Sequence, residues 1–220
     1  MKSSTEISRL VTGPLSVNTW CIPLDSTRAI VVDPGGDSST IIAHLAERRL
    51  SPVLFFLTHG HFDHISAIPA LCAAFPGVPV SIHAGDSQWL GKGALEKHSA
   101  FFEILGARWM VDRYGEELPS ANILSEDNQI ITLLDGTEIS EWKVLHTPGH
   151  SPGCVCYWNE KESVLISGDT LFASGVGRTD GPGGSQSELE DSLARLARLP
   201  PHTLVLPGHG ESTQLFRELY

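Results

Sequence analysis

The segment 58–64 places four potential metal ligands within six residues: His59, His61, Asp63 and His64. Neither a helix nor a strand has a packing use for three imidazoles and a carboxylate at this spacing. Neutral imidazole and carboxylate are, by contrast, ligands that divalent cations such as Zn²⁺ accept. The segment therefore predicts a metal centre, and the chain must adopt a fold that brings further ligands to it.

Three later segments offer those further ligands. Each combines an apolar run, a glycine at a turn and one ligand-type side chain: His150 within 146–153, Asp169 after 164–166, and His209 after 203–206. Ligands at the carboxyl ends of strands lie where open sheets usually bind. Two metal ions that keep a position open for water need about this many protein ligands. We therefore expect these side chains to join the segment 58–64 in one site.

The charge balance and the apolar runs argue against several classes of partner. With 15 basic and 26 acidic residues the formal net charge is −11, and binding a nucleic-acid backbone needs a basic surface. No apolar run approaches the length of a membrane span, and the N-terminal stretch lacks a signal-peptide core. We expect a cytoplasmic protein with no nucleic-acid or membrane partner; the sequence specifies no oligomeric state. The four cysteines are expected to be small buried side chains rather than a disulfide framework.

Strands and helices alternate in two successive halves of the chain, the second beginning near residue 129. Short apolar runs bounded by Gly, Pro, Asp or Asn predict strands at 17–22, 29–32, 53–58, 78–83, 144–146, 155–158 and 164–167. Apolar residues at helical spacing predict helices at 37–49, 65–74, 188–199 and 213–219. Two sheets packed face to face, with helices outside, would bury such a pattern.

The segment 91–128 departs from this pattern. A helical stretch at 94–105 is followed by a charged run that Pro and Gly interrupt. We interpret it as a helical insertion into a single domain spanning 1–220, one that interrupts the sheet rather than extending it. Such an insertion either covers a site or decorates the surface.

The order of the ligand motifs resembles that of the metallo-β-lactamase superfamily. A His-x-His-x-Asp-His segment is followed there by a His, an Asp and a His, here His150, Asp169 and His209. The segments 13–18 and 32–36 are typical of its thioesterase-like branch, so the resemblance covers almost the whole chain. It implies an α/β fold, the four-layered αβ/βα sandwich, with the site on one edge. It also implies two divalent metal ions, Zn²⁺ first, with Fe or Mn as alternatives.

The resemblance also assigns roles to the ligands. The first metal ion would be held by His59, His61 and His150, the second by Asp63, His64 and His209, with Asp169 bridging the two. Asp63 would in addition act in catalysis by orienting a hydroxide between the metals. Asp33, at a predicted strand end, would support the site through hydrogen bonds.

The glycine-rich loop 175–184 follows Asp169 closely and contains Arg178 and Asp180. The resemblance places both residues next to the ligands. The interpretation that we favour is that they pair with each other and hold the loop. The five other histidines are expected to be structural, although His146 is a candidate support for His150; they are His44, His83, His98, His146 and His202.

Resemblance to the short glyoxalase II-like hydrolases implies hydrolysis of a small-molecule thioester of the hydroxyacylglutathione type, typically S-lactoylglutathione. Few residues follow His209, so a C-terminal glutathione-binding domain is not expected. Contacts to glutathione would then come from basic residues of the insertion, namely Lys92, Lys97, Arg108 or Arg113.

Two other functions compete with this one. A persulfide dioxygenase of the same superfamily would hold a single Fe(II) through His59, His150 and Asp169, the facial-triad arrangement. A non-catalytic metal-binding scaffold is the third reading. The full set of seven ligand-type residues favours the two-metal hydrolase.

Overall fold

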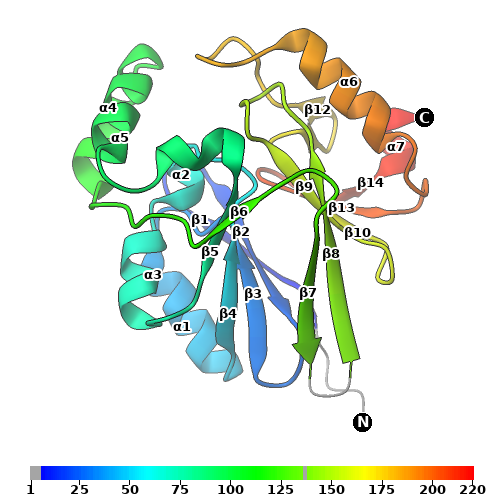
Figure 1. Cartoon of the computed structure of the whole chain (residues 1–220), viewed down its shortest axis with the longest axis horizontal. Coiled ribbons are helices and arrows are strands. Elements are labelled where there is room, and N and C mark those ends of the chain that lie inside the picture. The colour runs from blue at the N-terminus through cyan, green and yellow to red at the C-terminus, as the bar shows by residue number, and fades with distance from the viewer. Residues whose placement is uncertain (1–5, 136–137) are drawn as a thin grey trace.

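Two six-stranded sheets pack face to face in the computed structural model, which describes residues 6–135 and 138–220 (Figure 1). The first sheet has the order β1-β2-β3-β4-β5-β6, with bounds Ser8–Thr12, Val17–Pro23, Arg28–Val32, Ser51–Phe56, Val80–His83 and Ile123–Ser125. The second has the order β14-β13-β10-β9-β8-β7, with bounds Thr213–Gln214, Leu204–Pro207, Val164–Gly168, Val155–Asn159, Glu138–His146 and Ile130–Asp135. A ribbon of β11 (Leu171–Phe172) and β12 (Gly175–Val176) lies beside the second sheet.

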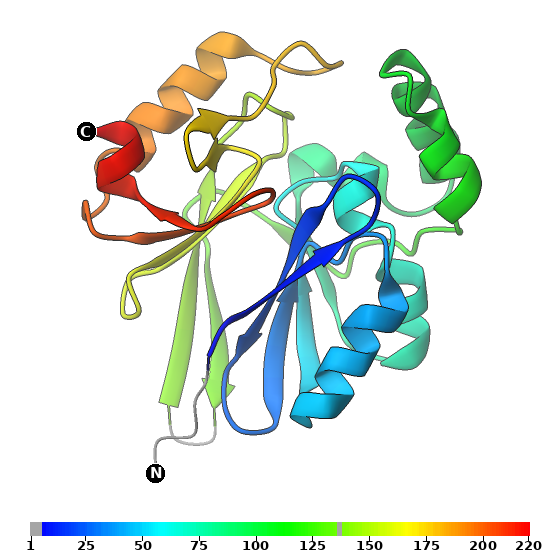
Figure 2. The ribbon, with the colours of Figure 1, turned by 180° about the vertical axis from the view of Figure 1, so that it is seen from behind.

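Helices cover the outer face of each sheet, which gives the four-layered α/β sandwich expected from the sequence (Figure 1 and Figure 2). Helices α1 (Ser38–Arg48) and α3 (Ile68–Ala74) lie on the first sheet. Helices α6 (Gln186–Leu196) and α7 (Leu215–Leu219) lie on the second.

Alternation along the strands divides the core into these layers. In β3, Ala29 and Val31 pack with the residues of α1 and α3, whereas Ile30 and Val32 pack with the residues of the other sheet. This is the consequence of a side-chain period of two along a strand. Both faces of β3 are buried, because each has another layer to cover it.

An aromatic pair joins the two sheets at the centre of the sandwich. The rings of Phe56 in β4 and Tyr157 in β9 stack with centroids 4.1 Å apart and planes 10° apart. The hydroxyl of Tyr157 donates to the carbonyl of Leu57 at 2.9 Å, so the one polar atom of this buried pair is satisfied. The contact fixes how β4 and β9 lie against each other.

Most predicted elements are confirmed, and two differ for physical reasons. The helix predicted at 65–74 is two helices, α2 (Phe62–Ile65) and α3, because Pro69 near the start of α3 lacks the N–H that would continue the turn before it. The helix predicted at 213–219 begins only at Leu215. Residues 213–214 pair with β13 instead, as strand β14.

The prediction that the segment 91–128 only interrupts the sheet is wrong. Strand β6 lies within it and pairs in parallel with β5, so it extends the first sheet by one strand. Before β6 the segment forms two helices, α4 (Ala94–Ile104) and α5 (Arg108–Tyr114). Both stand at the end of the sandwich where α2 lies (Figure 1).

His98 of α4 is buried among aromatic rings, and its protonation should make the stability of the protein depend on pH. Its Nε2 contacts the Trp89 carbonyl at 2.9 Å, and burial lowers its pKa to about 4. An unfolded chain takes up this proton near pH 6.5, so the contribution to stability is complete above that pH and is lost as the pH falls toward 4.

Between pH 7.5 and 5 this one group should cost the metal-stripped protein about 2 kcal/mol of unfolding free energy. His98→Gln keeps a donor for the Trp89 carbonyl and cannot titrate. Urea unfolding of both proteins at the two pH values tests this. The variant should lose less stability on acidification than the wild type, and equal losses would contradict the prediction.

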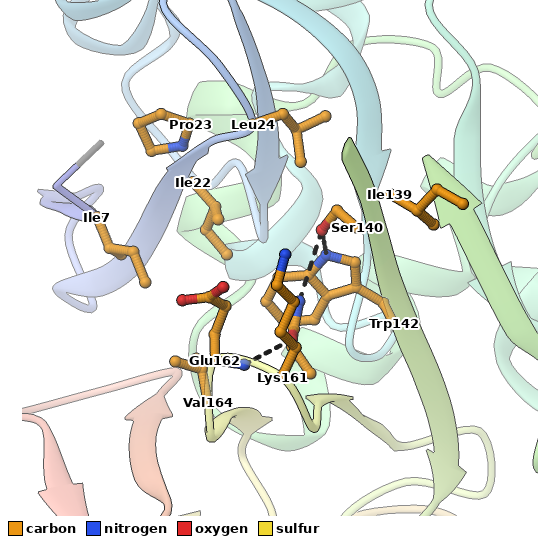
Figure 3. Close-up of a pocket in the computed structure, with 11 residues that line it drawn as sticks. Ile7, Ile22, Pro23, Leu24, Ile139, Ser140, Trp142, Lys161, Glu162 and Val164 are labelled. Atoms are coloured by element: carbon orange, nitrogen blue, oxygen red, sulfur yellow. Dashed lines mark hydrogen bonds between the residues drawn. The ribbon is translucent and has the colours of Figure 1, made fainter. Parts of the chain in front are cut away.

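A cavity of about 230 Å³ opens at the end of the sandwich away from the carboxyl ends of β3 and β4 (Figure 3). Ile22, Trp142, Lys161 and Glu162 are among its lining residues. Across residues 6–135 and 138–220, the groups of possible metal ligands all lie elsewhere. In that same part of the chain, no helix has the length and apolar character needed to cross a membrane.

Candidate metal centre

Loops from both sheets meet at one edge of the sandwich. Strand β4 leads into the loop of His59 and His61 and then into α2, which carries Asp63 and His64. From the second sheet, the connection after β8 carries His150, the end of β10 carries Asp169, and the end of β13 carries His209. Helices α4 and α6 stand on either side of this edge (Figure 1 and Figure 2).

Backbone hydrogen bonds between the sheets hold these loops together. Val155 N donates to Thr58 O at 2.8 Å, and Asn18 N donates to Gly208 O at 2.7 Å. The buried Asn18 side chain also donates to the carbonyls of Pro207 and Gly210, on both sides of His209. The loop of the last predicted ligand is therefore tied to β2, although the two are far apart in sequence.

Six of the seven predicted ligands come together in two groups of three. In the first, candidate ligand atoms of His59, His61 and His150 all lie within 4.8 Å of one another. His61 Nδ1 and His150 Nε2 are 2.9 Å apart. In the second, Asp63, His64 and His209 satisfy the same limit.

Asp169 lies between the two groups. One of its oxygens is 3.4 Å from His64 Nε2, and the other is 3.6 Å from both His150 Nε2 and His209 Nε2. A carboxylate in this position can contact a cation in either group.

Hydrogen bonds at Nδ1 orient three of the imidazole rings. His150 Nδ1 donates to the Arg178 carbonyl at 2.8 Å, and His64 Nδ1 donates to Asp33 at 3.0 Å. Thr58 Oγ1 donates to Asp33 at 2.7 Å and so accepts from His59 Nδ1 at 3.1 Å. With the proton on Nδ1, each ring presents the lone pair of Nε2 to the centre of the site.

Several of these inward-facing atoms have no partner within the protein. His59 Nε2, His64 Nε2 and Asp169 Oδ1 are buried and make no hydrogen bond. Each such atom costs roughly 1–3 kcal/mol when it is left unsatisfied. Divalent cations would satisfy all three, so the residues present fit metal ions on the evidence of this geometry.

The electrostatics of the site agree with this fit. Burial and neighbouring imidazoles hold the pKa of His59 well below its usual range and lower that of His61 to about 3, so both rings are neutral. Burial also opposes a charge on His64, but Asp169 and Asp63 outweigh it and hold the pKa of His64 well above its usual range. Asp63 and Asp169 thus favour a positive charge next to them. Either a proton on His64 or a cation that replaces this proton can supply it.

Asp33 supports the site, as expected, and is not available as a ligand. Its carboxylate accepts from Thr58 N, Thr58 Oγ1 and His64 Nδ1. Its backbone has a positive φ of 46°, which costs an aspartate on the order of 1 kcal/mol. Asp33, His59 and His64 form a third group of possible ligands, but three hydrogen bonds already engage both oxygens of this carboxylate.

Arg178 and Asp180 pair with each other in the loop after Asp169. The guanidinium Nε and one terminal nitrogen donate to the carboxylate at 2.7 and 2.9 Å. The Arg178 backbone carbonyl orients His150, a contribution to the site that the sequence did not predict. His146 Nε2 contacts the Pro152 carbonyl at 2.8 Å and so braces the same turn.

A cavity of about 180 Å³ lies over the ligands, and its wall is largely apolar. Leu15, Phe101, Phe102 and Leu105 line it, and Arg178 is the one cationic side chain among its lining residues. The basic residues of the insertion that we expect to contact the substrate are not among its lining residues, so that contact stays a prediction. Lys97, for example, contacts the Gln88 carbonyl.

The other three basic residues also face elsewhere. Arg108 pairs with Glu103 and Asp112, and the guanidinium of Arg113 lies over the Tyr114 ring. Lys92 lines a different hollow, together with Glu117. Position in the sequence suggested that these residues lie near the site, but none of the four is among the residues that line the cavity.

The sequence motifs did not mark Asp86, a fully buried aspartate just after β5. It accepts hydrogen bonds from Gly60, Ser151 and Gly153, which belong to two different ligand loops. No local signal could have found it, since its partners are distant in sequence. Spatial neighbourhood alone identifies it.

Known proteins are similar to this chain over most of its length. The sequence model of the "Metallo-beta-lactamase superfamily" matches residues 12–209. The "Probable metallo-hydrolase YqgX" of Bacillus subtilis is 33% identical over 96% of this chain and 92% of its own. The "Hydroxyacylglutathione hydrolase GloC" of Haemophilus influenzae is 32% identical over 88% of this chain and 85% of its own.

Three solved structures are similar over 96% of this chain. The BLEG-1 B3 metallo-beta-lactamase has a TM-score of 0.82 at 35% identity and is covered to 95%. TTHA1623 in a di-iron-bound form has a TM-score of 0.75 at 33% identity and is covered to 96%. ETHE1 from Myxococcus xanthus has a TM-score of 0.72 at 27% identity and is covered to 80%.

Proposed function

Because the chain belongs to the metallo-beta-lactamase superfamily, we propose that it is a dinuclear metal-dependent hydrolase whose substrate is a thioester of the hydroxyacylglutathione type. The observation that carries this proposal is the pair of ligand groups with Asp169 between them. A catalyst with one metal ion would need only one of these groups. The similarity to GloC supports the choice of thioester.

In this proposal, His59, His61 and His150 would hold one ion, and Asp63, His64 and His209 would hold the other. Two divalent ions, Zn²⁺ first and Fe or Mn as alternatives, would supply Lewis acidity that polarises the thioester carbonyl and makes water nucleophilic near neutral pH.

The chain's own residues position the reaction. Asp63 Oδ2 lies 3.6 Å from both His64 Nε2 and His209 Nε2 and faces the cavity. Although burial works in the other direction, His64 and His209 lower its pKa, so it is ionised and can accept a hydrogen bond from the attacking water. The apolar wall of Phe101 and Leu105 excludes bulk water from one side of the site.

The experiment that tests this function is a metal count combined with two assays. Protein loaded with Zn²⁺, Mn²⁺ or Fe²⁺ is analysed for bound metal, and turnover of S-lactoylglutathione and oxygen consumption with glutathione persulfide are measured. Two equivalents of metal and thioester turnover are expected. One equivalent of iron with persulfide-dependent oxygen consumption would overturn the proposal in favour of the persulfide dioxygenase.

That dioxygenase is the second candidate, since the structure of ETHE1 from Myxococcus xanthus is similar to this chain. It would use His59, His150 and Asp169 alone. Asp63 and His209 would then have no ligand role, although both lie among the groups that converge on the site. We therefore place the hydrolase first.

The apolar wall predicts a measurable contribution to substrate binding. Leu105→Ala should raise KM for the thioester about 5- to 10-fold with little change in kcat, because it removes apolar contact made equally in the ground and transition states. Ile104→Ala is the matched control, since Ile104 precedes it in the chain but is 70% exposed and does not line the cavity. Steady-state kinetics of both variants check this, and equal KM values would contradict the contact.

A further inference from the structure

Asp86 occupies a position in the first sheet that mirrors that of Asp33. Strands β3, β4 and β5 are parallel, and β4, which leads to His59, lies between the other two. Asp33 follows β3, and Asp86 follows β5 in the short 3-10 helix Ala84–Trp89. Parallel strands end at the same edge, so a buried aspartate flanks the ligand strand on each side.

The two aspartates hold different parts of the site. Asp33 binds the ring of a ligand directly, through His64 Nδ1. Asp86 binds no ligand ring. Its Oδ2 accepts from Gly60 N at 2.8 Å and from Ser151 Oγ at 2.7 Å, and its Oδ1 accepts from Gly153 N at 2.8 Å.

These three donors belong to the two loops that supply the first ligand group. Gly60 lies between His59 and His61, while Ser151 follows His150 directly. One loop comes from the first sheet and the other from the second. The Asp86 carboxylate is therefore a direct bridge between them, at the level where His61 Nδ1 and His150 Nε2 are 2.9 Å apart.

Close packing leaves this bridge little freedom. A Cβ atom at Gly153 would collide with Asp86, and a Cβ atom at Gly60 would collide with the Trp89 ring of the same 3-10 helix. Both loops thus approach this short helix as closely as glycine allows. The carboxylate is fully buried, which is costly for a charge unless donors satisfy it, and here three do.

We propose that Asp86 is a positioning residue for the first metal ion, one that sets the separation of His61 and His150 by joining their loops. This inference rests on the proposed metal centre but not on any substrate. Loss of the bridge lets the two loops separate, so the first ion loses affinity. The second ion keeps its ligands and the Asp33 support.

The test is a metal titration of Asp86→Asn, which keeps the size of the side chain but offers only one acceptor oxygen. Competition with a chromophoric chelator, using Zn²⁺ and Co²⁺, measures the two dissociation constants. The affinity for the first ion, the one that His59, His61 and His150 would hold, should fall about 10- to 100-fold, the usual effect of removing a group that orients ligands. The Co²⁺ absorption spectrum should report altered coordination at that ion only.

Asp25→Asn is the matched control. Asp25 accepts from Thr27 and Arg28 in the turn between β2 and β3, at the other end of the first sheet. Its substitution removes a comparable set of hydrogen bonds and should lower the melting temperature without changing either metal constant. A purely structural role for Asp86 would give the same result as this control.

Ser151→Ala keeps the test decisive if Asp86→Asn does not fold, because it removes one of the three donors and leaves the carboxylate in place. We expect a smaller fall in affinity for the same ion, severalfold rather than tenfold or more. Folded Asp86→Asn or Ser151→Ala protein that binds both ions as tightly as the wild type would overturn the inference. A wild-type protein that binds no divalent ion would instead overturn the metal centre and the proposed function.

Discussion

Asp169→Asn is expected to lower kcat/KM by at least about 10³-fold and to leave less than two equivalents of bound metal. The side chain lies between the two ligand groups, within 3.6 Å of His150 and His209 and 3.4 Å of His64. An amide keeps the shape but removes the negative charge that lets two cations lie close together. Metal analysis after dialysis and thioester kinetics on the same samples measure both effects.

The control for this variant is Asp180→Asn. Asp180 is exposed, lies in the loop that follows Asp169, and pairs with the exposed guanidinium of Arg178. Surface pairs of this kind contribute little, so kcat/KM should stay within about twofold. An Asp169→Asn enzyme that kept both ions and at least a tenth of its activity would rule out the bridging role.

Gly208→Ala should give the second-largest effect, and by steric means alone. A Cβ atom at this position would collide with Asp169 Oδ1 and lie 2.7 Å from His64 Cε1. The methyl group would therefore displace the bridging carboxylate or one of its neighbours. A displacement of about 1 Å can cost 10²-fold in rate, so we expect kcat/KM to fall roughly 10²- to 10³-fold.

Gly175→Ala is the matched control, because a Cβ atom at that position would meet no other atom within 4 Å. Circular dichroism and urea unfolding of the metal-free proteins separate the effect on the site from an effect on the fold. Gly208→Ala should fold and bind metal weakly, while Gly175→Ala should match the wild type. Equal metal content in both variants would contradict the predicted collision.

The sequence predicted the parts of this protein that local pattern encodes. The short apolar run at 29–32 predicted a strand, and in β3 both faces of that run are buried. The candidate ligands were predicted for a related reason: imidazole and carboxylate at this density have no use in packing. The order of the three later motifs then identified the family, which the match over residues 12–209 bears out.

The sequence did not predict contacts between residues that lie far apart in the chain. Strand β6 has only three residues, and its pairing is decided by the exposed edge of β5 rather than by its own propensity. Asp86 looks like an ordinary loop aspartate until Gly60, Ser151 and Gly153 are placed around it. The four basic residues of the insertion do not line the cavity over the candidate ligands, because their charge alone does not specify where their side chains point.

The candidate ligands come from both sheets, so the packing of the two sheets against each other affects how tightly metal ions bind. His59 and His64 follow β4, whereas His150, Asp169 and His209 follow strands of the other sheet. The relative placement of these groups depends on how the sheets dock, and the Phe56–Tyr157 stack lies at that interface.

Ions that bind only the docked arrangement stabilise it, by about 2.7 kcal/mol when free metal is a hundred times the dissociation constant. The same linkage runs in reverse. At a low concentration of free metal in the cell, the docked arrangement of the two sheets would be less stable. A variant whose sheets pack less well would need a higher concentration of free metal to reach the same metal occupancy.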